Sequence, residues 1–352
     1  VLAYVLLPYG LEYAAAGAAF GAVPGSLTGL VVLGGFYRYY KKQWRDEESA
    51  LPGAQLTPAR RLIKRLLLLA LPVSCANVIV PVTSSIDVLL VPKYLLAAGF
   101  SVKEATTQFG YLAGMAQPLL LMATIPTMSL ATSLVPAVSE AMALKRWALI
   151  EEKLATAMKL CCLITVPAAV GMSALAGPIS RLLYGTGEAA AAIMHSGPAI
   201  WFLGLQQVTT GMLQGMGHTN LPMLHMLAGI VAKLIAVCQL TNAEYGIAGA
   251  AWATNINFGV TAALNILALQ YFKIKFHWLS ICKIIFAALI MGAAAQALHG
   301  LLAGFNYTLA TLAALAGAGV VYAALLPLLR IISVAELKQL PLVKKLAQKL
   351  RK

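Results

Sequence analysis

Ten stretches of this chain are apolar enough to lie in a lipid bilayer, and all but the first are also long enough to cross one. The sequence is 60% hydrophobic and 11% charged, whereas soluble domains have roughly 45–50% apolar and about 25% charged residues. A soluble fold of 352 residues could not bury so much apolar surface. We therefore predict an all-α, polytopic membrane protein.

The pattern predicts the end of one helix followed by nine complete transmembrane helices. The partial helix lies at 1–9, and the complete spans lie near 11–37, 66–91, 109–136, 154–176, 193–215, 221–241, 246–271, 281–302 and 308–332. The chain begins with Val1 inside apolar sequence, with neither an initiator Met nor the basic start of a signal peptide. We expect it to be a fragment of a longer protein.

Lysine and arginine predict the orientation, because short cytoplasmic loops retain these residues and translocated loops are depleted of them. The segment 38–65 carries eight of them, and others cluster near 145–153, at 273–275 and in the tail 333–352. The loops near 92–108, 177–192, 242–246 and 303–307 hold only Lys93, Lys103 and Arg181. We expect the segment 38–65 and the C-terminus on the cytoplasmic side of the plasma membrane.

The basic tail at 333–352 alternates leucines with lysines, which is typical of an amphipathic helix lying on anionic membrane lipids; a solvated tail is the alternative. The loop bias and the anionic lipids account for the net charge of +14, so nucleic acid is not needed as a partner. All five cysteines fall inside predicted spans, and the five histidines form no ligand motif. We expect no cofactor, no metal and no enzymatic activity.

Polar residues within the spans are the candidates for function, because each is costly in hydrocarbon unless it faces protein or water. Asp87 is the strongest candidate, on a helix expected to be broken or bent by prolines and to carry other small polar groups. It is interpreted as binding a proton, a cation or a substrate amine; the alternative is an interfacial carboxylate that is hydrated or paired with Lys93. The same helical face carries Ser74, Asn77, Pro81 and Ser84, and the prolines are Pro72, Pro81 and Pro92.

The next span, 109–136, presents Gln117 and Thr124 on a face shared with Gly110 and Gly114, which indicates either a cavity wall or close helix packing. Lys233 lies in the middle of a later span and should meet an acidic partner, a hydrated pocket or an anionic ligand such as a substrate phosphate. Weaker candidates are Glu12, Gln206, Gln207, Gln214, Asn255 and Asn257.

Glycines recur every four residues at the start of the chain, at Gly17, Gly21, Gly25 and Gly29. Such a run permits close contact between helices, either within one chain or between two subunits.

Several segments resemble the stage V sporulation protein B type of polysaccharide exporter, within the multidrug, oligosaccharidyl-lipid and polysaccharide (MOP) exporter superfamily. The resemblance covers nearly the whole chain. It is carried by EYAAAG at 12–17, Ile86-Asp87 with Val91-Pro92, LAGMAQPL at 112–119, ATSLVPAVSEA at 131–141, LQGMGHTN at 213–220, EYGIAGAA at 244–251 and SVAELKQLP at 333–341.

The resemblance implies a helical bundle of the multidrug-exporter type, with two six-helix lobes facing a central cavity and two further helices. On this plan the parts are the end of the N-terminal lobe at 1–37, a cytoplasmic linker at 38–65, the C-terminal lobe at 66–271, the additional pair at 281–332 and the tail at 333–352. The rest of the N-terminal lobe would be a missing partner, so the fragment alone is not expected to transport.

The resemblance implies a flippase that moves a polyprenyl-diphosphate-linked saccharide, such as a peptidoglycan precursor, by alternating access. Lipid II flippases of the superfamily are associated with charged cavity residues, especially arginine, and the span 109–136 contains no arginine. The substrate therefore stays open among undecaprenyl-linked peptidoglycan precursors, other lipid-linked oligosaccharides and drug-like cations. Two alternatives to a saccharide flippase are a cation-coupled multidrug antiporter and a non-transporting scaffold for cell-wall assembly.

Overall fold

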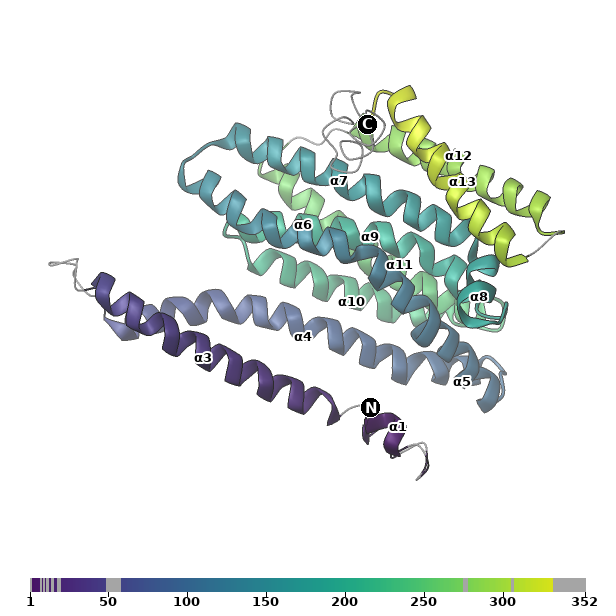
Figure 1. Ribbon diagram of the computed structural model, residues 1–352, viewed down its shortest axis with the longest axis horizontal. Coiled ribbons are helices and arrows are strands. Elements are labelled where there is room, and N and C mark those ends of the chain that lie inside the picture. The colour runs from purple at the N-terminus through teal and green to yellow at the C-terminus, as the bar shows by residue number, and fades with distance from the viewer. Residues whose placement is uncertain are drawn as a thin grey trace, which may run out of the picture. The chain divides into compact units, whose positions relative to one another are not determined.

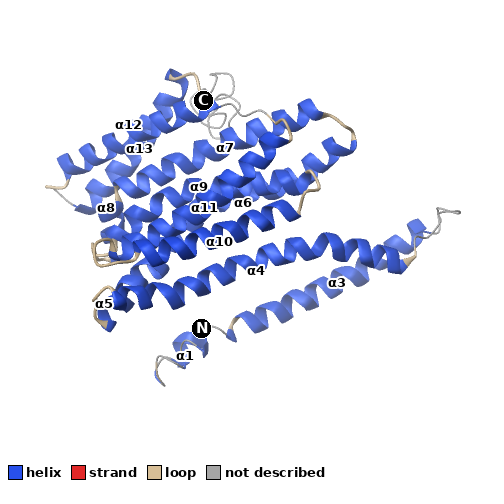
Figure 2. Cartoon of the chain, turned by 180° about the vertical axis from the view of Figure 1, so that it is seen from behind, coloured by secondary structure: helices blue, strands red, loops and turns tan. Residues whose placement is uncertain are grey.

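All regular secondary structure in the described part of the chain is helical (Figure 2). The computed structural model describes residues 2–6, 20–48, 58–274, 278–304 and 307–331, together with positions 8, 10, 13, 16 and 17. The predictions for Glu12, for the tail at 333–352 and for the side chains of Ser74 and Asn77 lie outside what is described. The chain divides into two compact units, Val1–Arg65 and Leu66–Lys352.

The first unit contains α1 (Leu2–Leu6) and α3 (Ala22–Glu48). Apart from the nearby backbone of α3 itself, no described residue lies within 4 Å of a Cβ built at Gly25 or Gly29. The close helix contact predicted from the glycine run is therefore not made within this unit at these two positions.

Long helices make up the second unit, and short turns join most of them (Figure 1). They are the part of α4 (Ala59–Ala97) from Leu66 onward, α5 (Val102–Gly110), η2 (Tyr111–Ala116), α6 (Gln117–Ala143), α7 (Trp147–Ala174), α8 (Ala176–Tyr184), α9 (Ala190–Gly215), α10 (Asn220–Leu240), α11 (Gly246–Tyr271), α12 (Trp278–Leu302) and α13 (Tyr307–Leu328).

The helix α9 forms the centre of this unit and packs against α6, α7 and α11, while α12 and α13 lie side by side against α7 (Figure 1). Small residues allow the close packing. A Cβ at Gly204 would lie 2.6 Å from the Thr165 Cγ2 atom of α7, and one at Gly211 would lie 2.7 Å from the Ala131 carbonyl oxygen of α6. These glycines are seven residues apart and therefore share one face of α9.

Within the described part of the chain, five helical stretches are long and apolar enough to cross a membrane: Val102–Ala143, Trp147–Ala174, Asn220–Leu240, Trp278–Leu302 and Tyr307–Leu328. The helices α9 and α11 have 26 residues each, about 39 Å at 1.5 Å per residue. Both carry several amide side chains, which lower their mean hydropathy. The observed limits of α11 match the predicted span 246–271.

The structure corrects one expectation about helix breaks. The helix α4 continues without a break through Pro72, Pro81 and Pro92, so the prolines do not divide it. The irregular segment is η2, a π-helical turn without proline that joins α5 to α6. A Cβ at Gly110 or Gly114 would meet no described residue within 4 Å, so no tight packing is described at these glycines.

Candidate functional site

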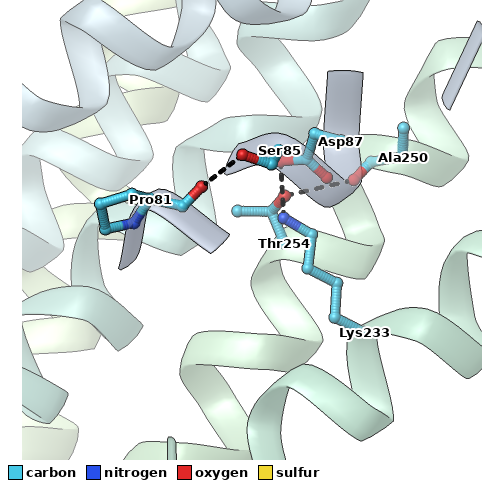
Figure 3. Close-up of polar contacts among 6 residues, drawn as sticks. All are labelled: Pro81, Ser85, Asp87, Lys233, Ala250 and Thr254. Carbon is cyan, nitrogen blue, oxygen red and sulfur yellow. Dashed lines mark hydrogen bonds and ion pairs between the residues drawn. The ribbon is translucent and has the colours of Figure 1, made fainter. Parts of the chain in front are cut away.

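The centre of the site is a buried ion pair between Asp87 of α4 and Lys233 of α10. The Lys233 Nζ atom lies 2.7 Å from the Asp87 Oδ2 atom and donates a hydrogen bond to it. The two residues are only 3% and 2% exposed. Figure 3 shows the lysine reaching from α10 to the carboxylate. Each charge supplies the partner that the other needs inside a low-dielectric interior.

The pair is positioned by the helices on which it lies. Asp87, Val91 and Leu95 are buried at successive four-residue steps, so one stripe of α4 faces the rest of the unit. A second polar contact joins the same two helices further along, where Cys238 Sγ donates to the Tyr94 hydroxyl at 2.9 Å. The helix α11 lies beside the pair, with the Thr254 hydroxyl bonded to the Ala250 carbonyl at 3.4 Å (Figure 3).

The ion pair opens onto a cavity of about 420 Å³, within the 300–1,000 Å³ typical of ligand pockets. Asp87 and Lys233 are the only charged side chains among the described residues that line it, so the lining has no net charge. The polar members of the lining are Thr83, Ser84, Asp87, Gln117, Gln206, Gln207, Thr210, Gln214, Lys233, Thr254 and Asn257. Its apolar members are Leu120, Leu121, Met128, Leu203, Met226 and Phe258.

The π-helical turn η2 ends immediately before Gln117 and so sets where this side chain enters the cavity wall. Two side chains from the region of α8 hold the turn: Tyr184 donates to the Met115 carbonyl at 2.9 Å, and Glu188 accepts from the Tyr111 hydroxyl. Widened helical turns of this kind are frequent at functional sites. The Gln117 side chain lines the same cavity as the Asp87 carboxylate.

A second polar network lies behind the cavity wall and is centred on Asn265 of α11. The Asn265 amide nitrogen donates to the Thr209 and Thr210 hydroxyls at 3.1 and 3.0 Å. Its Oδ1 atom lies 2.7 Å from the His225 Nδ1 atom. Because the amide nitrogen already serves both threonines, His225 Nδ1 is the donor in that contact. The network ties α9, α10 and α11 together and orients Thr210 at the cavity.

Replacing Asn265 with leucine is expected to lower the free energy of unfolding by about 1–3 kcal/mol, because the His225 N–H would lose its buried acceptor. Thermal unfolding of the detergent-solubilised protein measures the change. Gln270→Leu, at an exposed position of the same helix, is the control and should stay within about 0.5 kcal/mol of the parent. Equal stability of the Asn265→Leu and Gln270→Leu variants would contradict the structural role of the network.

Most of the candidates from the sequence come together at this cavity. Asp87, Ser84, Gln117, Lys233, Gln214 and Asn257 line it, as do Gln206 and Gln207. The alternative pairing of Asp87 with Lys93 is wrong, because the Asp87 carboxylate forms its ion pair with Lys233 and Lys93 is exposed. Of the partners expected for Lys233, the structure provides the acidic one.

Two candidates do not line the cavity. Thr124 is buried, but its hydroxyl bonds to its own helix at the Leu120 and Leu121 carbonyls. Asn255 donates instead to the His195 carbonyl at 2.8 Å. A helical face identified from sequence alone does not distinguish a cavity wall from a packed helix interface, because both kinds of face carry small or polar side chains.

Sequence reasoning missed Thr83, Thr210, Thr254 and Asn265, and it did not pair Asp87 with Lys233. The signal for the pairing was available in principle, since two opposite charges inside predicted spans each need a partner. Threonine gives no such signal, because its hydroxyl can bond to its own helix at any depth.

Comparison with known proteins decides the family. A family profile described as "Lipid II flippase MurJ" matches residues 60–318, which include every helix that lines the cavity. The chain belongs to the MurJ family. Its fold agrees, because a solved structure titled "Lipid II flippase MurJ, inward closed conformation" superposes with a TM-score of 0.57 at 18% identity, covering 79% of this chain and 57% of that one.

Two curated relatives from Bacillus subtilis (strain 168) are similar over most of this MurJ-family chain. "Stage V sporulation protein B" is 29% identical over 97% of the chain and 66% of its own length. "Uncharacterized membrane protein YabM" is 30% identical over 80% of the chain and 52% of its own length. The chain thus spans between half and two thirds of the length of these relatives. It is a multi-pass membrane protein of a transporter family and not an enzyme.

Proposed function

We propose that the complete protein flips a polyprenyl-diphosphate-linked saccharide, a peptidoglycan or polysaccharide precursor, from the inner to the outer leaflet of the cytoplasmic membrane by alternating access. The observation that carries this proposal is a cavity of about 420 Å³, bounded by helices of a MurJ-family lobe, whose described lining includes hydroxyl, amide and charged side chains. The similarity to "Lipid II flippase MurJ" supports a lipid-linked cargo.

The chemistry of the lining suits the saccharide part of such a cargo. Sugar hydroxyl and amide groups lose their water on leaving the aqueous phase, and the lining offers amides and hydroxyls as replacement partners. The methionines and Phe258 on the same wall provide adaptable apolar surface for the sugar rings. The polyprenyl tail can remain in lipid throughout, so only the polar head needs a path across the membrane.

The membrane arrangement that we propose retains nine complete spans and part of a tenth, with 38–65 and the C-terminus in the cytoplasm. Alternate placement of lysine and arginine supports this orientation. The lobe at 66–271 then faces the N-terminal lobe of the complete protein across the substrate path, and the basic tail contacts anionic lipids.

The test is growth rescue in bacteria depleted of their own lipid II flippase, using the complete reading frame that contains this chain. Rescue is expected, and it would identify a peptidoglycan precursor or a close mimic as cargo. Failure despite confirmed membrane expression would exclude that cargo. Drug resistance without rescue would indicate the multidrug antiporter, and a phenotype that survives substitution of several cavity residues would indicate the scaffold.

A further inference from the structure

Two buried oxygen atoms at the cavity have no hydrogen-bond partner among the described residues: Asp87 Oδ1 and Gln206 Oε1. Their side chains belong to residues that are only 3% and 7% exposed, and both residues line the same cavity. Buried polar atoms are almost always paired, so an unpaired acceptor calls for an explanation. Here two helices, α4 and α9, each bring one unpaired acceptor to one space.

The charge of the site restricts what can occupy it. Carboxylate and amide oxygens are common ligands of hard cations. The Lys233 ammonium already lies 2.7 Å from Asp87 Oδ2 and balances its charge. No other charged residue among those that the structure describes belongs to the lining, so a metal cation would leave a net positive charge in a poorly solvated space. The remaining occupant is an uncharged hydrogen-bond donor.

We propose that Asp87 Oδ1 and Gln206 Oε1 form a subsite that accepts hydrogen bonds from hydroxyl or acetamido N–H groups of the saccharide, with Lys233 as a built-in counter-ion in place of a metal ion. This inference rests on the proposed function and adds which part of the cargo this lobe contacts. A diphosphate is excluded from the subsite, because it would place its negative charges against two acceptor oxygens and a cation that is already neutralised.

The experiment is a ligand titration of the detergent-purified complete protein, followed by its thermal unfolding midpoint. The probes are di-N-acetylchitobiose, inorganic pyrophosphate, and sodium chloride against choline chloride at constant ionic strength. The uncharged disaccharide is expected to raise the midpoint saturably, and sodium and pyrophosphate are not. Gln206→Leu should raise the half-saturating disaccharide concentration about three- to tenfold, the loss of one hydrogen bond.

Two further variants keep the test decisive. Thr124→Val removes a buried hydroxyl that bonds to its own helix, so it should leave the titration unchanged. Lys233→Ala removes the counter-ion, so its midpoint should become dependent on sodium. If this variant does not fold, the Gln206→Leu arm carries the test alone.

Stabilisation of the unaltered protein by sodium, no response to the disaccharide, or an unchanged titration in Gln206→Leu would each overturn the subsite. These outcomes are separable from failure of the proposed function. Growth rescue without a disaccharide response would refute the subsite and leave the flippase proposal standing. A Gln206-dependent disaccharide response without growth rescue would support the subsite and exclude a peptidoglycan precursor as the cargo.

Discussion

Replacing Lys233 with methionine is expected to lower the free energy of unfolding by about 3–5 kcal/mol, because the substitution leaves the Asp87 carboxylate buried and uncompensated. Methionine has a similar length and is apolar, so the loss would come from the charge and not from a cavity. Denaturant or thermal unfolding of the purified protein in mild detergent measures it.

The double variant Asp87→Leu with Lys233→Met is the matched comparison. Replacing both members of a buried ion pair with apolar residues is often neutral or stabilising, so the double variant should recover most of the lost stability. We expect it to fail in the growth-rescue assay, because it removes the only charged groups of the described cavity lining. Full rescue by a stable double variant would remove the pair from the transport mechanism.

Replacing Gly249 with alanine is expected to cost at least about 3 kcal/mol, at the upper end of overpacking penalties. Gly249 lies in the first turn of α11, and a Cβ there would overlap the Leu240 carbonyl group at the end of α10 and lie 2.9 Å from the Thr241 amide nitrogen. These are backbone atoms, which cannot move aside as the end of a flexible side chain can. The turn would have to open, displacing the helices that carry Lys233 and Thr254.

Gly319→Ala in α13 is the control, since a Cβ at Gly319 would meet nothing within 4 Å. This substitution in a helix interior is expected to be neutral or to stabilise the protein by about 0.5–1 kcal/mol. Unfolding midpoints of the two variants in the same detergent give the comparison. Similar midpoints for both would show that the contact between α10 and α11 is looser than the structure describes.

The candidate site shows where sequence reasoning works in a membrane protein. Asp87 and Lys233 were identified separately, because a charge inside an apolar span is conspicuous. Thr124 and Asn255 were identified by the same polarity argument, yet the structure gives both of them local or packing roles. Asn77 and Glu12 stay predictions. Polarity in a span shows that a partner is needed, but it does not say whether that partner is backbone, another helix or a ligand.

The irregular turn at η2 could not be read from the sequence for a different reason. Proline removes a backbone donor, and its position is plain in the sequence, so Pro81 was expected to break or bend α4. The helix continues through it without a break. The widened turn at Tyr111–Ala116 contains no proline and is held by Tyr184 and Glu188, which are distant in the chain. The widened turn depends on these tertiary contacts, so local residue preferences do not predict it.

The amino-acid sequence by itself determined that this chain is a helical membrane protein, approximately where its helices begin and end, and which charges lie among apolar residues. These properties follow from hydropathy and from the 3.6-residue period, both of which are local. Only the tertiary structure decided that Asp87 meets Lys233, that Gln206 joins them at one cavity and that Thr124 does not. These outcomes depend on how α4, α9, α10 and α11 pack, and such packing is set by contacts between residues as far as 146 positions apart.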